Sequence, residues 1–231
     1  MNLPALSRCR QIHDKSLRNN RKVVMAKSRE SAEQLARLTH DIRNDIVFGA
    51  YEPGTWLKLS DLQDQHKASA FHIRRALDQL KSLKLVDHVA NAGFRVATPD
   101  EAVRQETRFV RTVLERGAAP LIVARATEED ISELLGLAQA FDQSIEAEGR
   151  RVQSRINHEF HDKLYGIAKN AVLSEMIKEL RSRSHHTTTG RWRSIEGLKA
   201  SSQDHFRMVE AIKARDPHEL ERLIVGHIEA F

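Results

Sequence analysis

Four side chains in the last third of the sequence have the types and the spacing of a metal site. Asn157 and His161 are four residues apart, so on a helix both side chains leave the same face about one turn apart. His205 and His227 are 22 residues apart, and the midpoint between them falls at Asp216-Pro217, which is a typical helix start. An antiparallel hairpin that turns at this midpoint brings both histidines to the same height. The four side chains can then converge on one cation.

Three imidazoles and one amide suit a divalent metal ion, with zinc, nickel, iron and manganese as candidates. Spacing alone leaves a second interpretation open, because the chain has 12 histidines and these four can be ordinary helix-surface residues. A third interpretation is a metal-dependent hydrolytic enzyme, in which the cation activates water. The sequence has no obvious general base beside the ligands except Glu159, which lies two residues from Asn157 and points away from it. We therefore expect that the protein is not an enzyme.

The elements that must position these side chains are helices. After Pro99 the apolar residues recur at helical spacing, with breaks at Gly149 and in a loop over residues 182–194, and with further helix starts near Ser201 and at Asp216-Pro217. Val110 and Val113 belong to the first of these apolar stripes. The pattern predicts that residues 99–231 form an antiparallel bundle of about six or seven helices.

Residues 31–98 have a different pattern, in which helices come before a small β-hairpin. An amphipathic helix ends before Gly49, and a proline-glycine turn follows it. Ser60 and Ser69 are candidate caps of two short helices, and Asn91-Ala92-Gly93 is a typical hairpin turn between apolar strands. This order of elements predicts a winged helix-turn-helix, so the expected fold class is mainly α with one small β-hairpin wing.

A winged helix reads double-stranded DNA with the first turns of its second short helix and with the tip of its wing. Arginines there can bind phosphates or guanine edges. Taken singly, the arginines also fit a solvated helix face, but the whole order of elements favours DNA binding. The predicted DNA-binding residues are Ser69, Phe71, His72, Arg74 and Arg75 on the helix, and Gly93 and Arg95 on the wing.

Residues 1–30 contain eight of the Lys and Arg residues and only two acidic residues, whereas the rest of the chain is close to neutral. This composition predicts a flexible basic tail, either an arm that binds DNA phosphates or a simply solvated terminus. The single cysteine, Cys9, excludes an internal disulfide. No apolar run is long enough to span a membrane, so we expect a cytoplasmic protein without a membrane partner.

Residues 46–57, IVFGAYEPGTWL, are similar to the stretch I-x-x-G-x-[LY]-x-P-G-x-x-L of the GntR family of bacterial regulators, and in particular of its FadR-like branch. Ser69, Arg74, Ala76 and Leu77 match the recognition helix of that family, V-S-R-T-P-V-R-E-A-L. Ala70 departs from the family pattern, because it replaces an arginine that commonly reads bases. The resemblance therefore implies a DNA-binding regulator with a different operator or with weaker DNA binding.

The resemblance also implies a C-terminal ligand domain of the FCD type. In that domain an Asp-x-x-x-His helix and two later histidines bind the metal, and Asn157, His161, His205 and His227 fall at those positions. Because an amide brings no negative charge, Asn157 weakens metal binding and favours an anionic ligand. Arg111 matches R-x-x-L-E and resembles a carboxylate clamp. Asn170 matches A-x-N, and it either lines the effector pocket or caps a helix.

Together these features predict a homodimeric regulator, more specifically a repressor, that binds a pseudo-palindromic operator. A small carboxylate effector is expected to control DNA binding from the metal site. The alternative is the same DNA-binding regulator with a metal-free C-terminal domain that serves for dimerisation and for binding a lipid or an acid.

Overall fold

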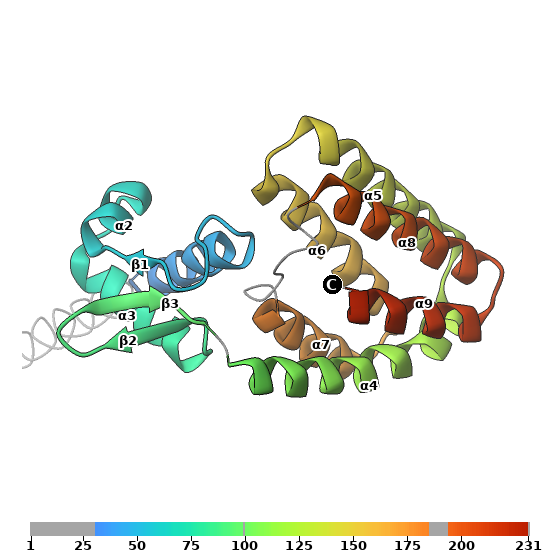
Figure 1. Ribbon diagram of the computed structural model, residues 1–231, viewed down its shortest axis with the longest axis horizontal. Coiled ribbons are helices and arrows are strands. Elements are labelled where there is room, and N and C mark those ends of the chain that lie inside the picture. The colour runs from blue at the N-terminus through green and yellow to red at the C-terminus, as the bar shows by residue number, and fades with distance from the viewer. Residues whose placement is uncertain (1–30, 99, 185–193, 231) are drawn as a thin grey trace, which may run out of the picture.

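The computed structural model describes residues 31–98, 100–184 and 194–230 (Figure 1). The basic tail of residues 1–30 lies outside the described residues. The described chain is mainly helical and has two groups of elements, as expected, and each group has its own apolar core. Among the described helices there is no candidate membrane span.

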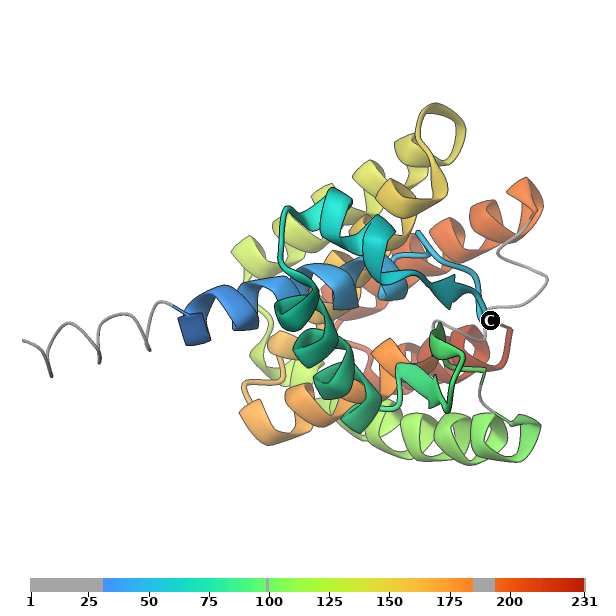
Figure 2. The ribbon, with the colours of Figure 1, turned by 90° about the vertical axis from the view of Figure 1, so that its left-hand side faces the viewer.

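The first group of elements is a winged helix-turn-helix with a small antiparallel sheet (Figures 1 and 2). The predicted hairpin is confirmed, and its second strand also pairs with a short strand that the sequence analysis did not predict. That strand is only two residues long, which is too short for an alternating pattern. The elements are a helix over residues 31–47, β1 (Trp56–Leu57), α2 (Leu59–His66), α3 (Ala70–Ser82), β2 (Val86–Val89) and β3 (Gly93–Val96).

The two short helices differ in how they begin. Ser69 caps α3 as predicted, because its hydroxyl accepts a hydrogen bond from the backbone N–H of His72. The predicted cap at Ser60 is wrong. The chain turns into α2 directly after β1, so Lys58 is the N-cap, and the hydroxyl of Ser60 donates to Asp61 instead.

The second group consists, in the described chain, of six helices, within the predicted range of about six or seven. The start of the last helix is confirmed, because Asp216 Oδ1 accepts from the N–H groups of His218 and Glu219. The preceding helix begins earlier than predicted, at Ile195, since Ser194 caps it and Ser201 is buried inside it. The helices are α4 (Glu101–Arg125), α5 (Glu128–Ala147), α6 (Arg150–Gly166), α7 (Ala171–Ser184), α8 (Ile195–Lys213) and α9 (Pro217–Ala230).

Part of one apolar stripe of the sequence does not face the core. α4 turns Ala118, Ala119 and Ile122 into the bundle, whereas Val110 and Val113 are exposed on its opposite side. The helical period in this segment was therefore correctly predicted, and these two valines lie on the side of the helix that is turned away from the core.

Candidate metal centre

Three histidines from three helices meet inside the bundle. His161 comes from α6, His205 from α8 and His227 from α9, and one nitrogen of each lies within 4.8 Å of the others. All three are buried, and His205 Nε2 is 3.2 Å from His161 Nε2. The ring of His205 stacks on Phe160, with 4.1 Å between the ring centroids, which fixes its orientation. The α8–α9 hairpin thus brings His205 and His227 together, as their spacing suggests.

The surroundings of the three rings favour the neutral imidazole. Burial lowers the pKa of His161 and of His205 well below the usual value, and the positive charge of Arg181 acts in the same direction. Burial also lowers the pKa of His227. A metal binds only the neutral imidazole, so at neutral pH these side chains are in the form that can ligate an ion.

Asp204 supports one of the three rings from outside the cluster. Its Oδ2 lies 3.2 Å from Nδ1 of His227. A carboxylate at one ring nitrogen is the arrangement that typically orients a histidine whose other nitrogen binds a metal.

Asn157 provides an independent indication of a ligand. Its side chain is only 3% exposed, on the same face of α6 as His161, and its Oδ1 accepts no hydrogen bond from the described part of the chain. Nδ1 of His161 and Nδ1 of His205 are likewise buried without a hydrogen-bond partner there. Because a buried polar atom without a partner is costly, this group of atoms fits a bound cation and its ligands.

A buried charge cluster lies next to the histidines. Glu115 of α4 is completely buried, and its carboxylate accepts from Arg111 Nε at 2.7 Å, from the hydroxyl of Tyr165 at 2.5 Å and from Arg181 Nη1 at 3.2 Å. Burial by itself raises the pKa of this carboxyl, but the two guanidinium groups outweigh that effect and the pKa is lowered. Tyr165 also stacks on His161, with 6.2 Å between the ring centroids, so the charge cluster and the histidines share one wall.

Arg111 is the one member of this cluster whose role was predicted from the sequence. The spacing of four residues between Arg111 and Glu115 was a signal of an ion pair on one helix. The contribution of Arg181 had no such signal, because α7 is far from α4 in the sequence.

Two other residues named from the sequence lie outside this cluster. Asn170 is exposed, and its Oδ1 accepts from the N–H of Leu173 at the start of α7, so it caps a helix and does not line the buried cluster. Glu159 is exposed and pairs with Arg155 at 2.6 Å, which leaves it a surface ion pair rather than a general base beside the histidines.

The side chains predicted to read DNA lie on the open side of α3 and on the hairpin. Phe71, Arg74 and Arg75 are exposed, and the Arg75 guanidinium lies over the Phe71 ring at 5.8 Å. The Ser69 hydroxyl is 3.0 Å from Nδ1 of His72. On the wing, Gly93 has a φ of +104°, a conformation that favours glycine, and Arg95 Nε lies 3.5 Å from the carboxylate of Asp87.

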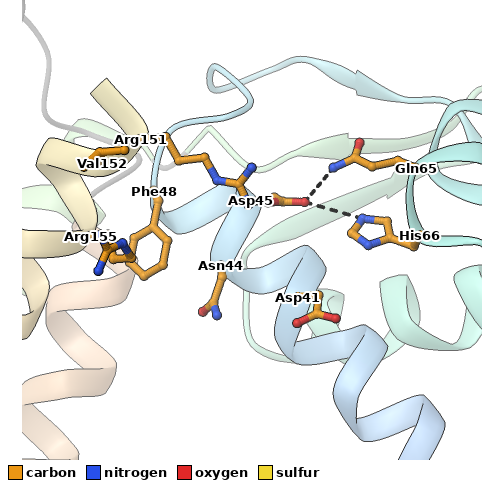
Figure 3. A pocket seen from close by; sticks show the side chains of 9 residues that line it. All are labelled: Asp41, Asn44, Asp45, Phe48, Gln65, His66, Arg151, Val152 and Arg155. Carbon is orange, nitrogen blue, oxygen red and sulfur yellow. Dashed lines mark hydrogen bonds and ion pairs between the residues drawn. The ribbon is translucent and has the colours of Figure 1, made fainter. Parts of the chain in front are cut away.

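Helix α6 also forms the junction between the two groups of elements (Figure 3). Asp45, on the helix over residues 31–47, is buried, and it accepts from Gln65 Nε2 at 2.8 Å and from Arg151 at the start of α6. Nε2 of His66 lies 3.4 Å from the same carboxylate. Two turns further along α6, His158 contacts Phe48 edge-on, with 5.1 Å between the ring centroids. A cavity of about 650 Å³ lies beside these contacts.

The chain matches two family models that together span nearly all of the described residues. Residues 34–96 match the bacterial regulatory proteins of the gntR family, and residues 106–230 match the FCD domain.

Relatives and solved structures agree with these matches. The Nta operon transcriptional regulator of Aminobacter aminovorans is 26% identical over 179 residues, which are 78% of this chain and 83% of that protein. The HTH-type transcriptional repressor GlaR of Escherichia coli K12 is 25% identical over 200 residues, 81% of this chain and 89% of that protein. Among solved structures, E. coli McbR/YncC superposes with a TM-score of 0.74 at 22% identity over 85% of this chain and 93% of its own.

These relatives are transcriptional regulators and not enzymes. Because the FCD match alone covers more than half of the chain, and because the gntR match covers the winged helix, the chain belongs to the GntR family of bacterial transcription regulators, in the FadR-like branch that carries a C-terminal FCD domain.

Proposed function

We propose that this regulator is a repressor whose DNA binding is controlled by a small carboxylate held at a metal site of Asn157, His161, His205 and His227. The observation that carries the proposal is the buried cluster of three neutral imidazoles beside the amide oxygen of Asn157, which has no hydrogen-bond partner among the described residues. The relative GlaR, which is named a repressor, supports the direction of regulation. In this proposal residues 31–98 bind DNA in the cytoplasm, and residues 99–231 bind the effector and form the dimer.

The composition of the ligand set is the reason to expect an anionic effector. Asn157 and the three imidazoles are all neutral, so a bound divalent ion would keep its full positive charge and would attract a carboxylate. Arg111 can hold the same carboxylate, because its contact with Glu115 uses Nε and a guanidinium has two further nitrogens. The proposed ligand class is therefore a small carboxylic acid that reaches both the cation and Arg111.

Helix α6 is the element that can carry the response to DNA. It presents Asn157 and His161 to the interior, and its first turn holds Asp45 of the winged helix through Arg151. An effector can change DNA affinity only if it prefers one arrangement of the two parts over the other. A shift of α6 on effector binding would alter the Arg151–Asp45 contact and with it the position of the recognition helix.

The experiment that tests this function measures binding of the full chain to the DNA upstream of its own gene by fluorescence anisotropy. Three states are compared: chelator-treated protein, protein loaded with zinc or nickel, and loaded protein titrated with a panel of small carboxylates. We expect salt-sensitive, sequence-selective binding that at least one carboxylate weakens only in the loaded state. Equal binding in all three states would support the metal-free alternative, and turnover of a carboxylate would support an enzyme.

The recognition helix gives a prediction about operator binding. We expect Arg74→Ala and Arg75→Ala each to weaken operator binding by about 1–3 kcal/mol if the arginine reads a base, with reduced discrimination at one base pair. If the arginine binds a phosphate, binding to all DNA sequences should weaken by a similar factor, and the DNA affinity should depend less steeply on salt concentration. Lys81→Ala is the matched control, because Lys81 is exposed in the last turn of the same helix. Unchanged binding by both arginine variants would contradict the assignment of α3.

The junction gives a second prediction. Asp45→Asn should lower the free energy of unfolding by about 1–3 kcal/mol, because it removes the charge from a buried carboxylate that accepts from Gln65 and Arg151. Urea unfolding followed by circular dichroism measures this loss. Arg151→Gln is the control and should cost less than about 1 kcal/mol, since the Arg151 side chain is mostly exposed. Both variants should reduce the effect of the carboxylate on DNA affinity. If the effect is undiminished in both variants, the Arg151–Asp45 contact does not carry the response from α6 to the winged helix.

A further inference from the structure

One serine hydroxyl lies inside the helical bundle without a hydrogen-bond partner among the described residues. Ser201 of α8 is completely buried, and its Oγ makes no hydrogen bond there. Ser201 precedes His205 by four residues, so the two side chains leave the same face of α8 about one turn apart. Its neighbour Ser202 differs, because the Ser202 hydroxyl donates to Asp142 Oδ1 at 2.8 Å. Ser201 therefore lies on the side of α8 that carries the candidate metal centre.

Two sets of contacts show how α6 and α8 run past each other. Ile156 of α6 and Leu198 of α8 belong to one small apolar cluster, and further along both helices the Phe160 ring stacks on the ring of His205. Both helices therefore pass the metal centre in the same direction. The proposed amide ligand on α6 and Ser201 on α8 each precede a histidine of the centre by one turn, so they lie at the same end of it.

The buried charge cluster lies at the opposite end of the centre. Tyr165, whose hydroxyl donates to Glu115, is one turn beyond His161 on α6, whereas Asn157 is one turn before it. Arg111, the proposed carboxylate clamp, contacts the same Glu115. Two helical turns span about 11 Å, so only a molecule of a few atoms can extend between the ends. The site thus has one end with guanidinium groups and one end with two uncharged oxygens.

A cation at the imidazoles would satisfy Asn157 but not Ser201. An amide oxygen can bind a divalent ion, whereas a serine hydroxyl is not among the usual ligands of zinc. A hydroxyl has one hydrogen to donate and lone pairs that accept, and leaving it buried without a partner is costly. The partner that fits is an uncharged oxygen of the bound acid, because the guanidinium groups that attract its carboxylate lie at the other end.

We propose that the Ser201 hydroxyl binds the effector directly and selects a small carboxylic acid with a second, uncharged oxygen, either a hydroxyl or a carbonyl. The proposal rests on the proposed function, because it takes the carboxylate to lie between the cation and Arg111. It adds the chemical class of the effector, which the metal ligands alone leave open. An acid without the second oxygen leaves the Ser201 hydroxyl buried and unpaired, and a site of this kind discriminates against such an acid.

Isothermal titration of the full, zinc-loaded chain tests this role with butanoate, its 2-, 3- and 4-hydroxy derivatives and 2-oxobutanoate. These acids differ only in the presence, position and type of one oxygen. At least one oxygenated acid should bind the wild type roughly tenfold more tightly than butanoate, because it pairs a hydroxyl that butanoate leaves unpaired. In Ser201→Ala this preference should fall to within about threefold, and the affinity for butanoate should not decrease.

Two further measurements separate an effector contact from a structural role. The zinc affinity of Ser201→Ala should stay within about threefold of the wild type, whereas loss of a serine that only orients His205 would lower it roughly tenfold or more. The free energy of unfolding of the ligand-free variant should not fall, because the substitution removes an unpaired hydroxyl from the core. Ser202→Ala is the matched control, since it removes a paired hydroxyl on another side of α8, and it should keep the preference for oxygenated acids.

A wild type that binds no oxygenated acid more tightly than butanoate would overturn the proposal. An undiminished preference in Ser201→Ala would overturn it as well, and so would a variant that loses zinc affinity but keeps the preference. The same titrations on chelator-treated protein distinguish this failure from a failure of the proposed function. A chain that binds no zinc would contradict the metal site, whereas a preference that disappears in Ser201→Ala would still assign the contact to this serine.

Discussion

The His161→Ala variant is expected to bind zinc or nickel at least about a hundredfold more weakly than the wild type, as the loss of a direct ligand should exceed that of a supporting residue. His161 is buried where its Nε2 lies 3.2 Å from His205 Nε2, so its removal takes one of three imidazoles from the centre. Isothermal titration of chelator-treated protein without a histidine tag measures the affinity directly.

Metal binding should also increase the free energy of unfolding, and we call this increase the metal increment. At a free metal concentration of about 100 times the dissociation constant, the wild type should gain about 2.7 kcal/mol, and His161→Ala should gain almost nothing at the same concentration. The increment, not the absolute stability, is the relevant readout, because the substitution also leaves a cavity in the core. His218→Ala is the matched control, since His218 is an exposed histidine on α9, the helix that carries His227.

A second substitution at this site separates coordination from packing. Asn157→Asp adds a negative charge at a buried position beside the histidines, so it should strengthen metal binding and weaken binding of the anionic effector. If metal raises the free energy of unfolding equally in the wild type, His161→Ala and Asn157→Asp, these residues do not form the metal centre. That result would favour a metal-free effector domain.

The second large effect is expected at the buried carboxylate of α4. Glu115→Ala should lower the free energy of unfolding by about 3–5 kcal/mol, because it leaves the buried guanidinium of Arg181 and the hydroxyl of Tyr165 without their shared acceptor. Urea unfolding followed by far-ultraviolet circular dichroism measures the loss.

Two variants serve as controls for this prediction. Glu115→Gln keeps the shape of the side chain and an acceptor for Tyr165 but loses the charge. Its free energy of unfolding should therefore lie between those of the wild type and the alanine variant. Glu221→Ala removes a similar glutamate–arginine contact on the surface and should cost less than about 1 kcal/mol. If Glu115→Ala and Glu221→Ala cost the same, the buried cluster does not stabilise the fold as described.

The charge cluster and the candidate metal centre lie so close together that they should respond to each other. Arg181 and Arg111 both lower the pKa of His161, after the larger effect of burial, and Glu115 holds both guanidinium groups in place. Loss of Glu115 would therefore loosen Arg111, which is the proposed clamp for the carboxylate. The effector affinity of Glu115→Gln should fall more than its metal affinity does.

Much of this architecture follows from short-range patterns in the sequence. The cap at Ser69, the hairpin turn before Gly93 and the helix start at Asp216 depend on a few neighbouring residues and their backbone geometry. The hairpin of α8 and α9 follows from the position of that start, and with it the meeting of His205 and His227. These features are local, so they can be predicted from neighbouring residues without the tertiary structure.

Contacts between segments that are far apart in the sequence could not be predicted from it and are seen only in the folded chain. Arg151 reaches Asp45 across 106 residues, and Arg181 reaches Glu115 across 66, and no periodicity in the sequence pairs them. The side of α4 that faces the core was likewise decided by packing, since Val113 belongs to the apolar pattern that predicts the helix but is exposed. A periodic pattern predicts that one face of a helix is apolar. The packing of the whole chain decides whether that face is buried by other helices of the same chain.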